Sequence, residues 1–81
     1  MPVYPPKSLP GFPDARRVRP KTPFPGGLRA RWRDEAGTIF EWDYQHGHVE
    51  MYDARGAHRG AFDPEDGRRV SGADRTRHVE P

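Results

Sequence analysis

The sequence predicts a mainly β protein, a highly twisted antiparallel meander preceded by an extended proline-rich arm. Eight of the ten prolines lie within the first 25 residues, and proline lacks the backbone N–H that helix interiors and sheet ladders need. From residue 28 onward, apolar and charged side chains alternate with a period of two, which is typical of half-buried strands. We therefore expect a basic arm over residues 1–27 and one sheet domain over residues 28–81.

The alternating segments predict five strands, at residues 28–33, 38–44, 49–52, 57–62 and 68–71. The connecting segments 34–37, 53–56 and 63–67 each contain Asp and Gly, which favour tight turns. A sheet of this size has one good apolar face. We expect Trp32 and Trp42 to pack on that face rather than to stack on a ligand.

The composition limits the size of the core. With 81 residues, 32% apolar content and a mean hydropathy of −1.09, the chain has room for one thin domain, which excludes a large enzyme with a deep pocket. The absence of cysteine excludes disulfides and thiolate metal sites. No apolar run approaches the roughly 20 residues that span a bilayer, and residues 1–6 do not resemble a signal peptide, so we expect no membrane partner.

Charge is strongly segregated along the chain. Residues 1–33 hold eight basic side chains and one acid, whereas residues 34–53 hold six acids and no Lys or Arg. Twelve of the fourteen basic residues are arginine, whose planar guanidinium binds phosphate in a bidentate manner. The basic region therefore indicates contact with a polyanion, with a simple solvated surface as the alternative.

The hairpin around residues 41–50 is the most informative segment. A three-residue loop would place Trp42 opposite Glu50, whereas a four-residue loop at residues 45–48 would place Asp43 opposite Glu50. The second register separates the side chains cleanly, so we expect it. One face then carries Phe40, Trp42, Tyr44, Val49 and Met51, and a solvent-facing side carries Glu41, Asp43, Glu50 and Tyr52, with His46 in the loop beside them.

Two carboxylates with Cβ atoms roughly 5 Å apart are unfavourable unless a cation or a shared proton compensates them. Asp43, His46 and Glu50 together are suited to proton transfer near neutral pH. A zinc site formed by His46, His48 and Glu50 explains the pattern less well. The remaining alternative is a pair of solvated carboxylates, with His46 capping a turn. We expect His58 and His78 to be solvated surface histidines.

Proton-transfer groups beside phosphate-binding groups fit cleavage of an RNA backbone, in which the ribose 2′-hydroxyl attacks its own phosphodiester. Because the substrate supplies the nucleophile, this step requires neither metal nor cofactor, and DNA would not react. The expected phosphate-binding side chains are Arg29, Arg31, Arg33, Arg59 and Arg77, and Tyr52 is expected to contact the substrate as well.

A series of residues in fixed order extends over more than two thirds of the chain: Pro20-Lys21-Thr22-Pro23, Gly27, Trp32, Ile39-Phe40-Glu41-Trp42-Asp43, Gln45-His46-Gly47, Glu50, Tyr52, Gly60, Phe62-Asp63-Pro64, Gly67 and Arg77. In order and spacing this series resembles the cytotoxic ribonuclease domain of the ribosome-inactivating colicins. Toxin tips of pyocins and of contact-dependent inhibition systems share the pattern.

The resemblance implies a highly twisted antiparallel sheet that cuts 16S ribosomal RNA once in the decoding centre and so stops translation. It implies that Asp43, His46, Glu50 and Arg77 are the catalytic residues. Glu50 would then act as the base, His46 as the acid, Asp43 as the group that orients His46, and Arg77 as the stabiliser of the phosphorane charge.

The resemblance also implies a monomeric toxic tip of a larger secreted protein, delivered into the cytoplasm of a target bacterium and held inactive by an immunity protein. That partner is expected to be acidic, because the first third of the chain is basic. Two alternatives stay open at this point. One is a non-catalytic module that binds RNA or ribosomes, and the other is a general ribonuclease with no ribosome preference.

Overall fold

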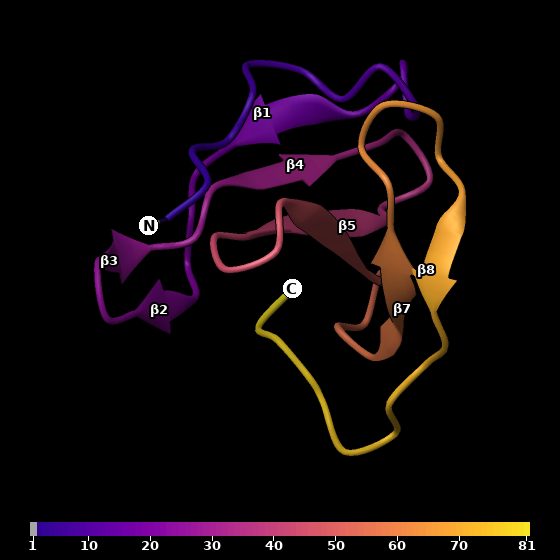
Figure 1. The fold of residues 1–81 in the computed structure, drawn as a ribbon. Coiled ribbons are helices and arrows are strands. Elements are labelled where there is room, and N and C mark those ends of the chain that lie inside the picture. The colour runs from indigo at the N-terminus through magenta and orange to yellow at the C-terminus, as the bar shows by residue number, and fades with distance from the viewer. Residues whose placement is uncertain (1) are drawn as a thin grey trace.

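The computed structural model describes residues 2–81, which form an antiparallel sheet of six strands and a separate two-stranded hairpin (Figure 1). The main sheet has the order β1 (Arg16–Val18), β4 (Arg31–Arg33), β5 (Ile39–Asp43), β6 (His48–Tyr52), β7 (His58–Phe62) and β8 (Arg69–Ser71). The hairpin consists of β2 (Pro23–Phe24) and β3 (Gly27–Leu28). The predicted twisted antiparallel meander is confirmed. No helix in residues 2–81 has the length and apolar character to cross a membrane.

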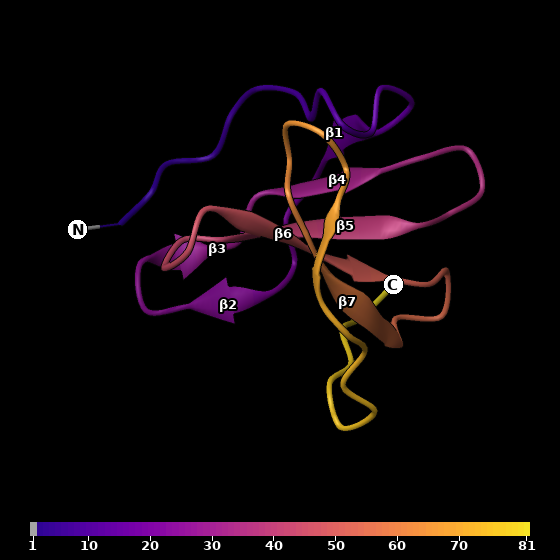
Figure 2. The same cartoon turned by 45° about the vertical axis from the view of Figure 1, so that its right-hand side comes forward.

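The N-terminal arm takes part in the main sheet, so the predicted boundary at residue 28 is wrong. Strand β1 pairs with β4 at the edge of the sheet, with Arg16 opposite Arg33 (Figure 2). Residues 14–19 contain no proline, so their N–H groups can pair with a neighbouring strand. The expected strand at residues 28–33 is split, because Leu28 belongs to β3 and Arg31–Arg33 forms β4.

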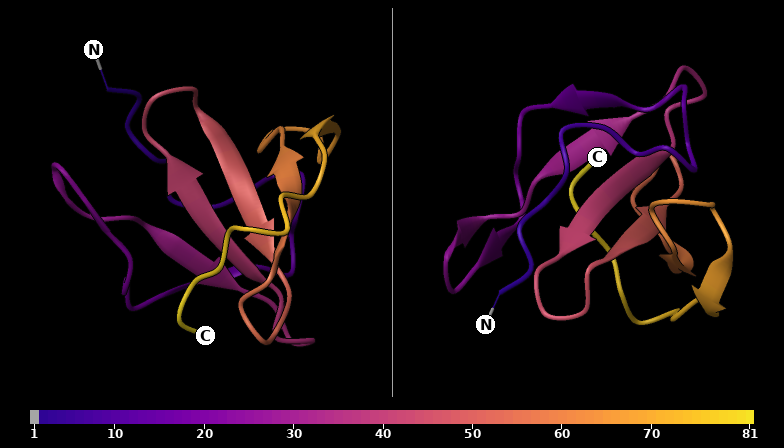
Figure 3. Two further views of the ribbon diagram at one scale, coloured as in Figure 1. Left: turned by 90° about the horizontal axis from the view of Figure 1, so that it is seen from below. Right: turned by 45° about the horizontal axis from the view of Figure 1, so that its top comes forward.

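One face of the sheet carries the larger apolar core, and the N-terminal segment crosses it (Figure 3). The buried members of this core are Leu9, Ala15, Ala30, Trp32, Phe40, Trp42 and Val49. The indole N–H of Trp32 donates to the carbonyl of Lys7 at 3.3 Å, and that of Trp42 donates to the carbonyl of Val3 at 2.7 Å. The prediction that both tryptophans pack in the core is confirmed, and their indoles also fix the arm in place.

The register of the β5–β6 hairpin differs by two residues from the expected one. Glu41 lies opposite Glu50 and Asp43 lies opposite His48, so the prediction that Asp43 faces Glu50 is wrong. The loop is residues 44–47, closed by a hydrogen bond from the Gly47 N–H to the Asp43 carbonyl at 2.9 Å. A shift of two residues leaves every side chain on its face. The apolar sorting is therefore as predicted, and Asp43 and Glu50 still share a face.

The polar face of the sheet is less open than expected, because the C-terminal segment covers part of it (Figure 3). Ile39, Tyr52 and Val79 form a second apolar cluster, and the Val79 N–H donates to the carbonyl of Gly56 at 2.9 Å. Glu41, Glu50 and Tyr52, all expected to face solvent, are buried, with 0%, 8% and 3% of their surface exposed. The end of β5 that carries Asp43, together with the following loop, remains accessible on this face.

Candidate active site

The loop after β5 holds a histidine against an aspartate. The Asp43 Oδ1 atom accepts the backbone N–H groups of Gln45 at 2.9 Å and His46 at 3.2 Å, and Asp43 Oδ2 lies 2.8 Å from His46 Nδ1. Aspartate forms such turns because its short side chain reaches the N–H groups of the next residues. The His46 ring is 59% exposed, so its Nδ1 faces Asp43 while Nε2 remains available to a ligand.

Asp43 is held in its ionised form. Partial burial raises the pKa of the Asp43 carboxyl, but the hydrogen bonds from the His46 side chain and from the backbone N–H groups of Gln45 and His46 together lower it further. The net pKa lies below the ordinary value of 3.8. A carboxylate in this state can orient an imidazole and stabilise its protonated form.

A second polar cluster surrounds Glu50 in the middle of β6. Its Oε1 accepts hydrogen bonds from His58 Nε2 at 2.7 Å and from Arg77 Nη1 at 2.8 Å. Within residues 2–81 no hydrogen bond engages Oε2, and this atom is not sealed from solvent. Although Glu50 as a whole is only 8% exposed, one of its oxygens is therefore a free acceptor.

His58 is buried against Glu50, so the expectation of a solvated surface histidine is wrong. The backbone N–H of Asp74 donates to His58 Nδ1 at 2.9 Å. Because an amide nitrogen can only donate, Nδ1 carries no hydrogen, and the ring hydrogen lies on Nε2, where it is donated to Glu50. The burial of His58 could have been predicted from the alternation of side chains along β7. Arg59 is exposed, so the preceding residue, His58, faces the opposite side, next to β6.

Arg77 reaches this cluster from the segment after β8. Its Nη2 donates to the Tyr52 hydroxyl at 3.0 Å. Burial lowers the pKa of Arg77, but the neighbouring Tyr52 and Glu50 raise it by more, and burial raises the pKa of Tyr52. The guanidinium is thus a permanent cation beside a neutral phenol. With its side chain 43% exposed, it can also reach a phosphate.

The other predicted arginines lie in different surroundings. Arg31 is buried, and its Nη2 lies 2.7 Å from Glu41 Oε2. The expectation of an accessible phosphate contact there is wrong, because the register places Arg31 directly opposite Glu41. Arg29 donates from Nη1 to the Trp42 carbonyl at 3.1 Å, close to Asp43. Arg33 pairs with Ile39 at the far end of β5, and Arg59 is exposed on β7.

The two polar clusters occupy successive positions on one face. Asp43 lies opposite His48, and His48 and Glu50 are two residues apart on β6, a rise of roughly 7 Å. In residues 2–81 no three His, Asp or Glu side chains come together in a metal-binding arrangement, so His46, His48 and Glu50 do not form the zinc site considered above. This face carries Asp43 with its exposed partner His46, and Glu50 with its partner Arg77.

Sequence comparisons relate the chain to known proteins. The profile of a family described as Cytotoxic matches residues 3–80. Three Escherichia coli proteins are similar over 77 residues: cloacin at 44% identity, colicin E3 at 42% and colicin-E6 at 40%. Each alignment covers 90% of this chain but 14% of the relative, so the chain corresponds to a small part of those longer proteins.

Proposed function

The chain belongs to the Cytotoxic family and is similar to cloacin, colicin E3 and colicin-E6, and from this premise we propose that it is a bacterial toxin ribonuclease. Its substrate is 16S ribosomal RNA in the small subunit, which it cuts in the decoding centre without a metal ion or cofactor. The observation that carries the proposal is the free Oε2 of Glu50 on the same face as the Asp43–His46 pair.

In the proposed reaction Glu50 Oε2 takes the proton of the ribose 2′-hydroxyl, and the 2′-oxygen attacks the adjacent phosphorus. Arg77 stabilises the charge that develops on the phosphorane oxygens. His46, protonated on both nitrogens, gives its Nε2 proton to the leaving 5′-oxygen while Asp43 stabilises the imidazolium. The products are a 2′,3′-cyclic phosphate and a free 5′-hydroxyl.

The remaining expected residues receive separate parts in this proposal. Arg29, Arg33 and Arg59 contact phosphates outside the reacting linkage. Tyr52 positions Arg77 through its hydroxyl. Arg31 has no direct part, because its guanidinium is engaged by Glu41.

The proposal extends to partners and place of action. The domain acts as a monomer in the cytoplasm of the target bacterium after delivery by a larger secreted protein. An acidic immunity protein inhibits it in the producing cell. The basic first third of the chain supports this partner, since complementary charge accelerates association.

The decisive experiment compares intact ribosomes with purified ribosomal RNA, each incubated with the protein in the presence of a chelator, followed by mapping of the new RNA ends. A single cut in 16S RNA of intact ribosomes, with a 2′,3′-cyclic phosphate end, supports the proposal. Diffuse fragments from both substrates would indicate a general ribonuclease. Binding without any cut would indicate a non-catalytic module, and dependence on a metal would contradict the mechanism.

A further inference from the structure

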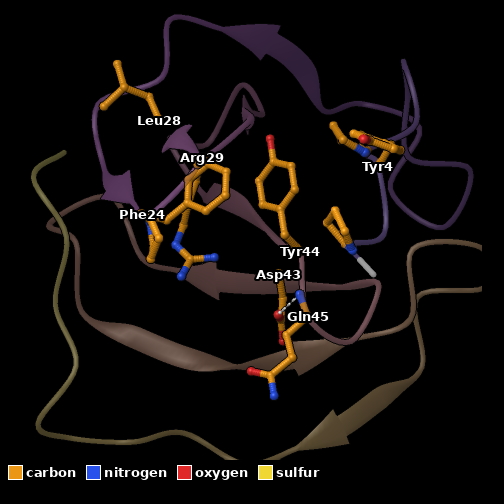
Figure 4. Close-up of a pocket in the computed structure, with 11 residues that line it drawn as sticks. Tyr4, Phe24, Leu28, Arg29, Asp43, Tyr44 and Gln45 are labelled. Atoms are coloured by element: carbon orange, nitrogen blue, oxygen red, sulfur yellow. Dashed lines mark hydrogen bonds between the residues drawn. The ribbon is translucent and has the colours of Figure 1, made fainter.

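A cavity of about 800 Å³ lies beside the active-site loop, where the β2–β3 hairpin, the end of β5 and the N-terminal segment meet. Its walls include Tyr4, Phe24, Leu28, Arg29, Asp43 and Tyr44 (Figure 4). We refer to it as the aromatic pocket. Asp43 belongs both to this pocket and to the pair with His46, so a ligand in the pocket would lie next to the proposed reaction centre.

Two of the three aromatic side chains that line the pocket are already arranged in parallel. The rings of Phe24 and Tyr44 stack with centroids 4.2 Å apart and planes 14° apart. The Arg29 guanidinium lies over the Phe24 ring at 5.4 Å, and the Tyr44 hydroxyl accepts the Ala30 N–H at 3.4 Å. Figure 4 shows Tyr44 between Phe24 and Tyr4. The pocket therefore contains a stacked pair of aromatic rings with a guanidinium beside it.

The pocket also exposes apolar surface. In residues 2–81 the exposed large hydrophobic side chains are Val3, Tyr4, Leu28 and Val70, and two of these four line the aromatic pocket. Tyr4 is 79% exposed, and its side chain forms no hydrogen bond within the described residues. Clustered exposed apolar groups at the rim of a cavity are typical of a ligand site.

We propose that the aromatic pocket binds one unpaired nucleobase of the RNA substrate, adjacent to the linkage that is cut. Single-stranded bases stack on aromatic rings and on arginine planes, and the pocket offers both. Arg29 provides the positive charge for the attached phosphate. This inference rests on the proposed function, because it places the base beside Asp43 and His46.

A binding assay tests the subsite independently of cleavage. The probe is a short single-stranded oligodeoxynucleotide with one 2-aminopurine base, which lacks the 2′-hydroxyl and stays intact. We expect its fluorescence to be quenched by the wild-type protein, and Tyr4→Ala and Phe24→Leu to bind about tenfold more weakly. Tyr4→Phe keeps the ring and should bind like wild type. Val70→Ala removes an exposed apolar side chain on β8 and is the matched control.

Absence of quenching by the wild-type protein overturns the subsite, and so does equal binding by all variants. Such results are expected if the pocket accepts an apolar peptide side chain instead. Because Tyr4 is highly exposed, we expect Tyr4→Ala to fold like the wild type. Circular dichroism checks this. If Phe24→Leu does not fold, the Tyr4 pair of variants still decides the question.

Cleavage kinetics separate this inference from the proposed function. With intact ribosomes as the substrate, we expect Tyr4→Ala to raise KM about tenfold, with its loss in kcat/KM arising from KM. RNA cleavage with the same KM in wild type and Tyr4→Ala would reject the subsite and retain the ribonuclease. Quenching of 2-aminopurine that depends on Tyr4, with no RNA cut by the wild-type protein, would retain the subsite and reject the ribonuclease.

Discussion

Glu41 and Glu50 lie directly opposite each other on β5 and β6, and each carboxylate is neutralised by a different arginine. The Arg31–Glu41 pair is buried, with each side chain only 1% exposed. In the Glu50–Arg77 pair, by contrast, the Arg77 side chain is 43% exposed. The two glutamates on this face therefore belong to different ion pairs: that of Glu41 is internal, and that of Glu50 is accessible. The first stabilises the sheet, and the second is available for the proposed chemistry.

Replacement of Glu41 by Gln should destabilise the fold by about 3–5 kcal/mol, because it leaves the Arg31 charge buried without a counter-ion. Urea unfolding would measure the loss.

The Arg31–Glu41 pair is imperfectly satisfied, because Arg31 Nη1 and Glu41 Oε1 have no hydrogen-bond partner. We therefore expect the double variant Arg31→Met with Glu41→Leu to be more stable than either single change. Arg68→Gln, in an exposed pair with a 3.9 Å separation, should change stability by less than about 1 kcal/mol. Equal effects of Arg68→Gln and Glu41→Gln would contradict the assignment.

Glu50→Gln should reduce RNA cleavage by about 10²–10⁴-fold, because the amide oxygen is a poor base. The circular dichroism spectrum should be retained, since Gln has nearly the same shape and lies off the main apolar core. Glu35→Gln, at an exposed position in the β4–β5 turn, is the charge-matched control and should cleave like wild type. Full activity of a folded Glu50→Gln protein would remove Glu50 from the mechanism.

The stability difference between wild type and Asp43→Asn should depend on pH. The folded-state pKa of Asp43 lies below 3.8, so its ionised form stabilises the fold above that pH, and this contribution is lost as the pH falls through the lower folded-state pKa. We expect Asp43→Asn to be less stable by about 1 kcal/mol at neutral pH, with the gap closing in acid. Unfolding of both proteins between about pH 2 and pH 7 measures it.

Two further aspartates do not disturb that comparison. The pKa of Asp53 is lowered first by the backbone N–H of Ala57, and that of Asp74 first by the Thr76 side chain. Both residues are present in wild type and variant, so their titration cancels in the difference. A gap that stays constant down to the lowest pH would show that the Asp43 carboxylate is not stabilised in the folded state.

Gly47→Ala should destabilise the protein by about 1–2 kcal/mol and lower its activity. Gly47 has a φ of +72°, which L-residues adopt at a cost, and an added Cβ would lie 3.2 Å from Val3 Cγ1. His46 precedes it in the same loop, so its position should change as well. Gly72→Ala meets nothing within 4 Å and should be neutral within about 0.5 kcal/mol. Thermal unfolding and cleavage rates of the two variants check this, and an unaffected Gly47→Ala would mean that the loop relaxes without cost.

The strands β5, β6 and β7 were predictable to within one residue because apolar and polar side chains largely alternate in them and turn residues separate them. The register was not predictable from that alternation alone, because a slip of two residues preserves both faces. What decides it is local turn chemistry: Asp43 binds the N–H groups that follow it, and Gly47 closes the loop. Arg31 is buried for a separate reason, because the pairing of β4 with β5 places it directly opposite Glu41.

The arm and the Glu50 cluster were harder to foresee, because both depend on contacts between distant segments. Proline density indicated an extended arm, but the short proline-free stretch of β1 still joins the sheet. His58 was expected at the surface from the average behaviour of histidine, whereas Asp74 and Glu50 enclose it from two other segments. Asp43, His46, Glu50 and Arg77, the four residues expected to be catalytic, form two contact pairs, Asp43–His46 and Glu50–Arg77, and their joint role stays a prediction.

The segment that follows β8 completes the Glu50 cluster from outside the meander. Its Asp74 N–H fixes the tautomer of His58, and its Arg77 engages Glu50, while residues 72–78 are themselves exposed. Without these two contacts, Glu50 would lack its cation and His58 Nδ1 would lack its hydrogen bond. The proposed reaction therefore depends on a segment that belongs to no strand of the sheet, because that segment supplies both the cation beside Glu50 and the hydrogen bond that orients His58.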